Sequence, residues 1–507
     1  MTGTTQANGG LLTINGDLRN SALTINDGGT VGGTGTAGAT IVKQGGRLAP
    51  GNSIGTLKIN NSLTFEAGSQ LDMEIDNTGK SDLIQVSGGT GAVTINGGKV
   101  NIIAAPGDYA NGSRYTLLTT TGAITGKFDQ IADNLAFLDS SLDYTDPSKI
   151  DLLLTRNATS FTDIATSKNQ RATSRAVTSA NIAALSNALT VLDANTARHA
   201  YDQLSGEAHA SALGVVTEDS EFVRRTMAER LYKGEGGLWT QASGASRQVD
   251  GTSNSDSLSN SRTSTLVGYD RKLADSDWNL GVLGGYSNNK ADTQGSDIKI
   301  NSYHLGAYAG THFDKLQLKL GAGLSTNRLD SKRDIAFGSY SSKEKSSYNA
   351  TGLQGFAELG YAAQLGKVAV EPFINLAGVN VQRDGFKEKG DSAAQLEGKS
   401  TSTFTAFTTL GSRLRHGFTV GDRAVQLTGS VGLRHADGDV TPSSKNRFAT
   451  GENFSVDGAP IARDVLVYEA GLSTQLAKDV TLGVSYAGQS SSDSQNHGGQ
   501  VALNWAF

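Results

Sequence analysis

The last ten residues of the chain, GGQVALNWAF at positions 498–507, decide the fold. In this stretch apolar side chains alternate with small or polar ones, and successive side chains of a strand point to opposite faces. The apolar face carries Val501, Leu503, Trp505 and Phe507. A strand with one apolar and one polar face suits a wall with lipid outside and water inside, so this stretch predicts a transmembrane β-barrel.

The same two-residue period recurs from residue 237 onward. Leu316, Leu318 and Leu320 share one face of a candidate strand, while Gln317 and Lys319 share the other. Longer polar loops are expected near 250–260, 330–346, 384–398 and 439–460. An even number of antiparallel strands can close into a barrel, and twelve are predicted. They lie near 237–246, 262–274, 277–289, 298–312, 315–329, 347–365, 368–383, 400–416, 422–437, 463–476, 479–490 and 498–507.

Composition excludes several other kinds of protein and site. No segment approaches the roughly 18 to 20 consecutive apolar residues of a membrane-spanning helix, so any membrane span must be made of strands. The 507 residues include no cysteine, which removes disulfides, thiolate nucleophiles and zinc–thiolate sites. A net charge of -5 gives no electrostatic footprint for nucleic acid.

Residues 9–156 have the pattern of many short strands. Runs such as LTI at 23–25, LTF at 63–65 and VTI at 93–95 are separated by turns rich in Gly, Asn, Asp, Thr and Ser. Strands this short and this alike favour a stack of coils, each adding one or two strands to a shared core. The region therefore predicts a parallel β-helix.

From about residue 160 to 233 the period becomes helical. No proline occurs between Pro147 and Pro372, which leaves long helices unobstructed. The last part of this region is polar around most of its circumference, which is unsuitable for an apolar core but suits a water-filled lumen. The predicted lumenal side chains are Glu218, Asp219, Glu221, Arg224, Arg225, Glu229 and Arg230.

The order of these three regions resembles the C-terminal part of a monomeric autotransporter of the type V secretion system. RLAPGNSIGTL at 47–57, with SDLIQV at 81–86, is similar to the passenger-associated transport repeat. YTLL at 115–118 with GKF at 126–128 is similar to the end of many passenger domains, and YDQLSGEAH at 201–209 resembles the segment ahead of many such barrels. The residues that carry the repeat motif are Leu48, Pro50, Gly51, Asn52, Ser53, Gly55 and Leu57.

This resemblance implies three domains. They are a β-helical passenger remnant with an autochaperone-like end (1–156), an α-helical linker whose last part lies in the barrel lumen (157–233), and an outer-membrane β-barrel (234–507). The resemblance also implies contact with outer-membrane lipid and lipopolysaccharide, assembly by the barrel-assembly machinery and periplasmic chaperones, and a passenger at the cell surface. A host or cell-surface ligand is a further expected partner.

The opening residues, MTGTTQANGG at 1–10, contain neither a basic n-region nor an apolar h-region. No secretion signal is therefore expected within this chain. Because an outer-membrane barrel must first cross the inner membrane, we expect the sequence to be a fragment of a longer precursor or to have a start assigned too late.

Motifs that look catalytic lack the context they need. Gly51-Asn-Ser53-Ile-Gly55 matches G-x-S-x-G, but the segment that follows predicts a strand rather than the helix of a nucleophile elbow. The seven histidines show no metal-ligand spacing. Asn181 and Asn195 lie where some autotransporters cut their own linker, without a matching motif. We expect no catalytic residue, cofactor or metal.

These features predict a translocator that exports or displays its β-helical passenger at the surface without ATP, since coil-by-coil folding outside the cell can bias transport. The chain itself is predicted not to be an enzyme. One alternative is a surface adhesin, although an exposed apolar ladder on the coils is not evident. Another is the C-terminal part of a secreted protease or esterase whose catalytic domain is missing upstream. A diffusion porin is disfavoured because a helix near 212–232 would plug the lumen.

Overall fold

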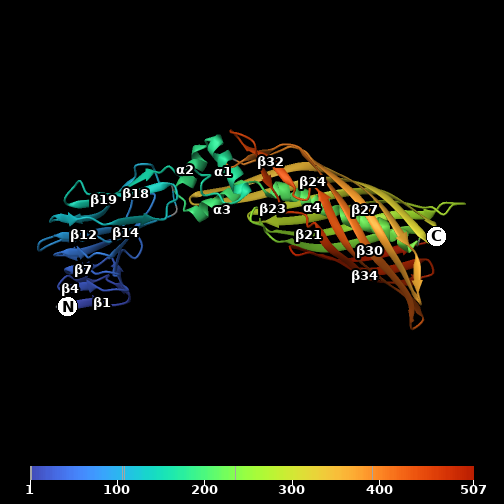
Figure 1. The fold of residues 1–507 in the computed structure, drawn as a ribbon, viewed down its shortest axis with the longest axis horizontal. Helices are drawn as coiled ribbons and strands as arrows, with labels where there is room; N and C mark the ends of the chain where they lie inside the picture. The colour runs from blue at the N-terminus through green and yellow to red at the C-terminus, as the bar shows by residue number, and fades with distance from the viewer. Residues whose placement is uncertain (1–2, 106, 108, 235, 391, 507) are drawn as a thin grey trace. The chain divides into compact units, whose positions relative to one another are not determined.

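The computed structural model describes residues 3–105, 107, 109–234, 236–390 and 392–506, and the fold is mainly β, as predicted (Figure 1). The chain forms two compact units. The first consists of Met1–Ile164, Ile182–Ala200 and Ala336–Tyr340, and the second of Ala165–Asn181, Tyr201–Ile335 and Ser341–Phe507. No helix among the described residues is long and apolar enough to cross a membrane.

Parallel strands of the first unit stack into three sheets. One contains β1 (Gly3–Ala7), β4 (Ser21–Ile25), β7 (Thr40–Val42), β10 (Leu63–Phe65), β13 (Val93–Ile95) and β16 (Ile124–Gly126). A second contains β2 (Gly10–Thr13), β5 (Gly29–Gly33), β8 (Arg47–Pro50), β11 (Gln70–Ile75), β14 (Lys99–Ala104) and β17 (Gln130–Asp133). The third contains β3 (Asp17–Leu18), β6 (Thr36–Ala37), β9 (Thr56–Asn60), β12 (Leu83–Ser87), β15 (Arg114–Thr120), β19 (Lys149–Arg156) and β18 (Leu138–Asp143). Because each strand up to β14 pairs with the third strand along the chain, these residues form the predicted parallel β-helix.

The core of the β-helix follows from its short apolar runs. Ile25, Val42, Phe65 and Ile95 are in register on successive coils, and all four side chains are buried. Burying an apolar side chain of this size stabilises a fold by roughly 1.5 to 3 kcal/mol. The middle residue of each run points outward, which explains why it is threonine in the runs at 23–25, 63–65 and 93–95. The antiparallel β18–β19 hairpin ends the stack beside β15.

Four helices follow the β-helix in the chain. They are α1 (Lys168–Ala180), α2 (Ala183–Thr190), α3 (Ala194–Leu204) and α4 (Ala208–Lys233). Ser167 and Gln170 form a capping box that begins α1, and Asn181 ends it with a left-handed φ of 50°. The expectation of unobstructed long helices is therefore wrong for residues 168–204, because Asn181 and the turn after Thr190 stop the helices without any proline.

Twelve long antiparallel strands form the barrel of the second unit, as predicted. They are β20 (Gly237–Val249), β21 (Leu258–Lys272), β22 (Asn279–Thr293), β23 (Ser296–Phe313), β24 (Leu316–Phe337), β25 (Tyr340–Tyr361), β27 (Val368–Arg383), β30 (Thr401–Val420), β31 (Arg423–Gly438), β34 (Asp464–Ala477), β35 (Val480–Ser490) and β36 (Ser494–Trp505). The short β26 (Ala363–Leu365) pairs with β27 after β25. Pairing of β20 with β36 and of β25 with β27 closes the barrel.

One predicted loop is part of the barrel wall. Residues near 330–346 were expected to form a loop. In the structure, β24 ends only at Phe337 and β25 begins at Tyr340. Both strands keep alternating faces through this region, with Arg333 and Glu344 buried, so polar composition alone misled the prediction. Four short strands form a small antiparallel sheet in the loops 384–400 and 439–463: β28 (Phe386–Lys387), β29 (Leu396–Gly398), β32 (Ser443–Phe448) and β33 (Phe454–Asp457).

Exposed apolar side chains cover the outer face of the barrel. Leu410, Leu433 and Leu466 lie in register on three adjacent strands, and Leu433 is 67% exposed. In the C-terminal strand, Val501, Leu503 and Trp505 are also exposed, as their alternation predicts. Phe507 lies outside the described residues. An apolar exterior combined with a polar interior is typical of a barrel in a lipid bilayer.

Candidate functional site: a charged helix inside the barrel

Helix α4 is enclosed by the barrel strands. It contacts β22, β23 and β27, and it pairs with side chains of β20, β21, β31, β34 and β36 (Figure 1). The helix ends at Gly234, whose φ of 65° favours glycine, shortly before β20 begins. Burial of a charged helix is costly unless each charge finds a partner. The interior of the wall supplies those partners.

Arg230 anchors the C-terminal end of α4 to β21 and β36, the two strands that pair with β20. Its guanidinium donates two hydrogen bonds to the Asp270 carboxylate, at 2.9 and 3.0 Å, and a third to Asn504 Oδ1 at 3.0 Å. The Tyr308 hydroxyl also donates to Asp270 at 2.6 Å, and Trp239 Nε1 donates to that hydroxyl at 3.0 Å. The helix is thus tied to the first strands and to the last strand, where the barrel closes.

Acidic residues of α4 face arginines of the wall. Glu218 accepts hydrogen bonds from Arg434 Nη2 at 3.1 and 3.2 Å, and Arg247 Nη1 lies 3.8 Å from the same carboxylate. Glu221 accepts hydrogen bonds from Arg434 and from Gln489. Glu218 and Arg434 are buried. Removing one partner of such a pair strongly destabilises the fold, because the remaining charge is then buried alone.

The same arrangement continues around the helix. Asp219 accepts from Arg262 Nη1 at 3.0 Å and from Ser287 Oγ at 3.2 Å, on two adjacent strands. On the other side, Arg224 Nη1 donates to Gln354 Oε1 at 2.9 Å. Partners therefore lie on strands from opposite parts of the barrel, which fixes the rotation of α4 about its axis.

Glu229 of α4 and Glu469 of β34 share donors beside the C-terminal half of the helix. Arg225 Nε lies 3.3 Å from Glu229 Oε1 and 3.8 Å from Glu469 Oε2. Gln500 Nε2 donates to both carboxylates, at 3.3 Å each. All seven charged side chains predicted to be lumenal thus contact the wall or a charged neighbour inside the barrel.

A second charged cluster belongs to the wall alone and was not predicted as a unit. Lys319 Nζ lies 3.1 Å from Glu358 and 2.5 Å from Glu371. Arg413 donates to Glu358 at 2.5 and 2.9 Å and lies 3.2 Å from Glu371. Charged residues at inward positions of apolar strands are the sequence signal for such a cluster, but only the register of the strands identifies the partners.

The helix does not fill the barrel. A cavity of about 120 Å³ lies between α4 and the strands from β25 to β35. Its lining includes Arg224, Tyr232, Phe407, Arg413 and Glu469. Among the described residues, no group of three or more His, Asp or Glu side chains could hold a metal ion. The cavity is therefore a space beside the helix that charged and apolar side chains line together.

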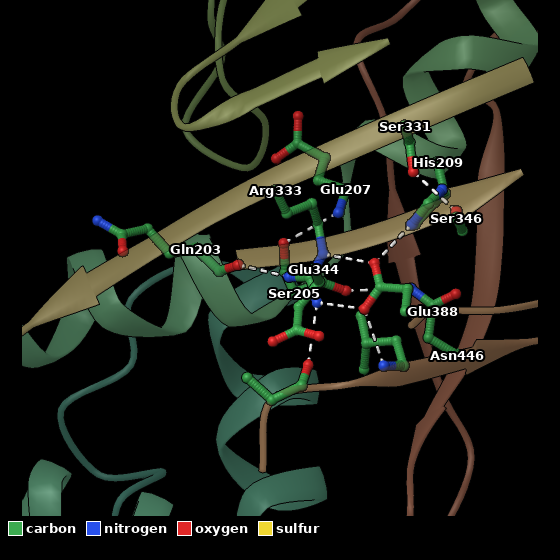
Figure 2. A network of polar contacts seen from close by, with 12 residues as sticks. Gln203, Ser205, Glu207, His209, Ser331, Arg333, Glu344, Ser346, Glu388 and Asn446 are labelled. Atoms are coloured by element: carbon green, nitrogen blue, oxygen red, sulfur yellow. Dashed lines mark hydrogen bonds and ion pairs between the residues drawn. The ribbon is translucent and has the colours of Figure 1, made fainter. Parts of the chain in front are cut away.

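At the end of the barrel that carries the long loops, buried charges surround the start of α4 (Figure 2). Arg333 donates to both carboxylate oxygens of Glu388, each at 2.7 Å, and His209 Nε2 lies 3.0 Å from Glu388 Oε1. His209 Nδ1 lies 2.8 Å from the Tyr348 hydroxyl. Burial acts to raise the pKa of Glu388, but the Arg333 guanidinium and its hydrogen bonds lower it to about 2. We call Arg333, Arg383, Glu388, His209 and Tyr348 the mouth cluster.

The residues of the repeat motif lie in the β-helix, around the turn between β8 and β9. Leu48 and Leu57 are fully buried, Pro50 ends β8, and Asn52 donates to Asn15 on a preceding coil at 3.0 Å. Gly51 has a φ of 89°, which disfavours any other residue. Ser53 lies in this turn, and β9 follows it directly, so the surroundings of a nucleophile elbow are not present there.

A buried carboxylate from the next coil holds this turn. Asp82 accepts hydrogen bonds from the backbone N–H of Gly55 at 2.9 Å and of Glu74 at 2.7 Å. Its side chain is almost completely buried. Burial raises the pKa of Asp82 to about 7, although both backbone donors favour the charged form. The motif therefore acts as a structural joint between coils.

The comparison with protein families decides the identity of the barrel. Residues 238–487 match the model of the autotransporter beta-domain. The barrel is an autotransporter beta-domain. The predicted resemblance is thus confirmed, and the lumenal position of α4 in this autotransporter barrel comes from the geometry described above.

Proteins similar to the whole chain include two from Serratia marcescens, both named extracellular serine protease. One is 30% identical over 571 residues and the other 28% identical over 567 residues, and each alignment covers 100% of this chain and 54% of the relative. The chain thus spans about half the length of these curated relatives.

Two solved structures are similar to the autotransporter barrel. The translocator domain of the autotransporter NalP from Neisseria meningitidis is 18% identical, with a TM-score of 0.48, over 59% of this chain and 100% of that one. The beta domain of the Bordetella autotransporter BrkA is 18% identical, with a TM-score of 0.42, over 54% of this chain and 99% of that one.

Proposed function

We propose that this chain is the translocator and distal passenger of an autotransporter. The beta-domain inserts into the outer membrane as a barrel, α4 occupies its lumen, and the β-helix of residues 3–156 is exported through it to the cell surface. One observation carries the proposal: a closed barrel with an apolar exterior encloses the helix that joins it to the preceding part of the chain. A chain that enters a barrel through its lumen must have passed one end of that lumen.

The outer face supports contact with outer-membrane lipid. Tyr286 and Tyr303 pair across β22 and β23 with their rings 5.4 Å apart, and both are exposed. Next along the same strands, Asn288 and Asn301 pair beside the exposed Arg328. Aromatic side chains of membrane barrels favour the level of the lipid headgroups. We propose that lipopolysaccharide contacts this region, and that the barrel-assembly machinery and periplasmic chaperones deliver the barrel to the membrane.

The β-helix supports an export mechanism without ATP. Each coil adds buried side chains to the same core, as the register of Ile25, Val42 and Phe65 illustrates. A coil that folds outside the cell offers its unpaired strand edges to the next coil, so folding biases movement outward. Tyr109 and Tyr115 donate from their hydroxyls to backbone carbonyls of Ile75 and Asp76, linking coils at the end nearest α1 in sequence. That end is suited to serve as the folding nucleus or as a cap.

The test is surface exposure of residues 3–156. The whole chain is expressed in a Gram-negative host behind a cleavable signal peptide, and intact cells are treated with an external protease. We expect the barrel to migrate as a heat-modifiable band and residues 3–156 to be removed from outside. The same chain without the signal peptide is the control. A heat-modifiable barrel with residues 3–156 protected in intact cells would contradict export.

A second candidate function follows from the names of the Serratia relatives. We propose that proteolytic activity, where the relatives have it, belongs to residues outside the alignment, and that this chain serves as carrier. Ser53 lies in a turn between coils and supports this assignment. The purified chain is assayed with a fluorophosphonate probe of active serines, beside Ser53→Ala. We expect equal and negligible labelling, whereas labelling lost in Ser53→Ala would make the chain an enzyme.

A further inference from the structure

The segment 201–211, which leads from α3 into α4, is held by a different part of the barrel at almost every second residue. Arg333 Nη1 donates to the Gln203 carbonyl at 2.7 Å, and Asn446 Nδ2 donates to the Ser205 carbonyl at 3.0 Å (Figure 2). The backbone N–H of Asp256 donates to Glu207 Oε1 at 3.0 Å, and that of Ala459 to Ser211 Oγ at 2.9 Å. His209 binds Glu388 and Tyr348, as described above. The donors come from β24, β32, and the loops 250–257 and 439–463.

Two arginines of the mouth cluster depend on this segment. Arg333 and Arg383 are almost fully buried, and a single carboxylate, Glu388, is bound to Arg333. Arg383 Nη1 donates to the His209 carbonyl at 3.3 Å, and Nη2 donates to the Lys399 carbonyl at 2.6 Å. Both guanidinium groups therefore use backbone carbonyls of residues 203 and 209 as acceptors.

The loops over the lumen are built on the same residues. Glu388 lies between β28 and β29 and accepts from the Leu396 N–H at 2.8 Å, while Asn446 lies in β32 of the same small sheet. The Phe386 ring lies 3.9 Å from the His209 ring, measured between centroids. Without residues 203–209, the closed loops would bury Arg333, Arg383, Glu388 and Asn446 with donors and acceptors unpaired. Each unpaired buried group disfavours that arrangement, most strongly when the group is charged.

We propose that the segment 201–211 is a completion lock, whose arrival in the barrel mouth supplies the missing partners of the mouth cluster and closes the loops 384–400 and 439–463 over the lumen. The coupling between the segment and the loops does not depend on the proposed function. The further statement that this arrival marks the end of export does rest on the proposed function. The lock positions α4 from its N-terminal end, as Arg230 does from its C-terminal end. A chain still passing through the lumen would present other residues to the mouth and leave the loops open.

The test uses the full chain refolded in detergent, so that it requires no export. His209→Ala removes the imidazole between Glu388 and Tyr348, and Asn446→Ala removes two neutral hydrogen bonds, one to the Ser205 carbonyl and one from Ser444 Oγ. His435→Ala is the matched control, because His435 pairs with Asp464 at 2.7 Å while both side chains are exposed. Each variant is first checked for heat-modifiable migration. Trypsin cleavage within the loops 384–400 and 439–463 is then timed and its sites are identified.

We expect His209→Ala to be cut in these loops on the order of 100-fold faster than the parent, since breaking a buried charged contact opens the local structure. Asn446→Ala should show about a tenfold increase and His435→Ala none. Equal cleavage of parent, His209→Ala and Asn446→Ala would overturn the lock. If His209→Ala fails to form the barrel, the comparison of Asn446→Ala with His435→Ala decides in the same way. Failure of surface exposure in cells would count against export alone.

Discussion

Arg230 of α4 and Asp270 of β21 face each other inside the barrel through two parallel hydrogen bonds of 2.9 and 3.0 Å. Both side chains are about nine-tenths buried. A paired buried charge is tolerated, whereas the same charge left alone costs several kcal/mol. This pair joins the end of the lumenal helix to the wall at the strand next to the barrel closure, so it should be among the contacts that decide whether helix and barrel form one unit.

Replacing one partner of this pair should destabilise the barrel more than replacing both. We expect Arg230→Gln to lower the free energy of unfolding by about 3 to 5 kcal/mol, because Asp270 keeps its charge in a buried position. The double variant Arg230→Gln, Asp270→Asn should recover much of this loss. The measurement is urea unfolding in detergent, followed by loss of the heat-modifiable band. Lys272 and Asp277, an exposed pair at 3.2 Å, provide the control, for which Lys272→Gln should have no measurable effect. Equal losses in the single and double variants would contradict the prediction.

The stability of the β-helix should decrease as the pH rises toward 7. Asp82 has its pKa raised from 3.8 to about 7 in the folded chain, so the folded state holds a proton that the unfolded state has released between these values. The stabilising contribution is therefore complete below about pH 4 and is lost as the pH passes 7, with a slope of up to about 1.4 kcal/mol per pH unit. Asp82→Asn should flatten this dependence and also destabilise, since one backbone donor loses its acceptor.

Pulse proteolysis of residues 3–156 in the full chain, after equilibration in urea at pH 5, 6, 7 and 8, measures this dependence. Asp129→Asn serves as the control, because Asp129 is exposed and accepts a single backbone hydrogen bond from Gly98 at 3.0 Å. That variant should keep the slope of the parent. A parent whose urea midpoint is constant from pH 5 to pH 8 would show that Asp82 does not control stability.

A charge placed on the outer leucine row should disfavour membrane insertion. Leu433 is exposed between Leu410 and Leu466, where the proposed function places lipid. An arginine on the lipid face of a barrel costs about 2 to 4 kcal/mol near the middle of the bilayer and less near its surfaces. We expect Leu433→Arg to reduce the fraction that inserts into liposomes, while Leu433→Phe inserts as the parent does. Unchanged insertion of Leu433→Arg would place this row outside the bilayer.

The backbone of α4 lies so close to Gly458 that no side chain should fit at this position. A Cβ at this position would lie 2.4 Å from the backbone nitrogen of Ser211 and 2.7 Å from the carbonyl carbon of Ala210, at the start of α4. Neither backbone atom can move without shifting the helix, so Gly458→Ala should destabilise by about 1 to 3 kcal/mol. Gly417→Ala is the control, since nothing lies within 4 Å of its added Cβ. Thermal melting of the heat-modifiable band compares the two variants. Identical melting would show that the loop after β33 is free to move.

Much of the barrel could be predicted because its strands have a period of two. Lipid on one side and a polar lumen on the other impose opposite requirements on neighbouring residues, so the alternation of Leu503 with Asn504 is visible without knowledge of any contact. The seven charged residues of α4 were predicted for a related reason, since a helix that is polar on all sides suits no apolar core. Where polar residues occupy both faces of a strand, as in β24 at residues 330–334, the period carries less signal and a loop was predicted instead.

By itself, the sequence determined the kinds of element: short apolar runs that stack as coils, a polar helix, and twelve alternating strands. Only the tertiary structure decided which charges meet. Asp270 and Arg230 are 40 residues apart, His209 and Glu388 are 179 apart, and their contacts depend on the register of strands and on the rotation of α4. The physical reason is that periodicity is a local property, whereas electrostatic partners in a closed barrel are set by long-range geometry, where a shift of one residue would turn each side chain to the opposite face.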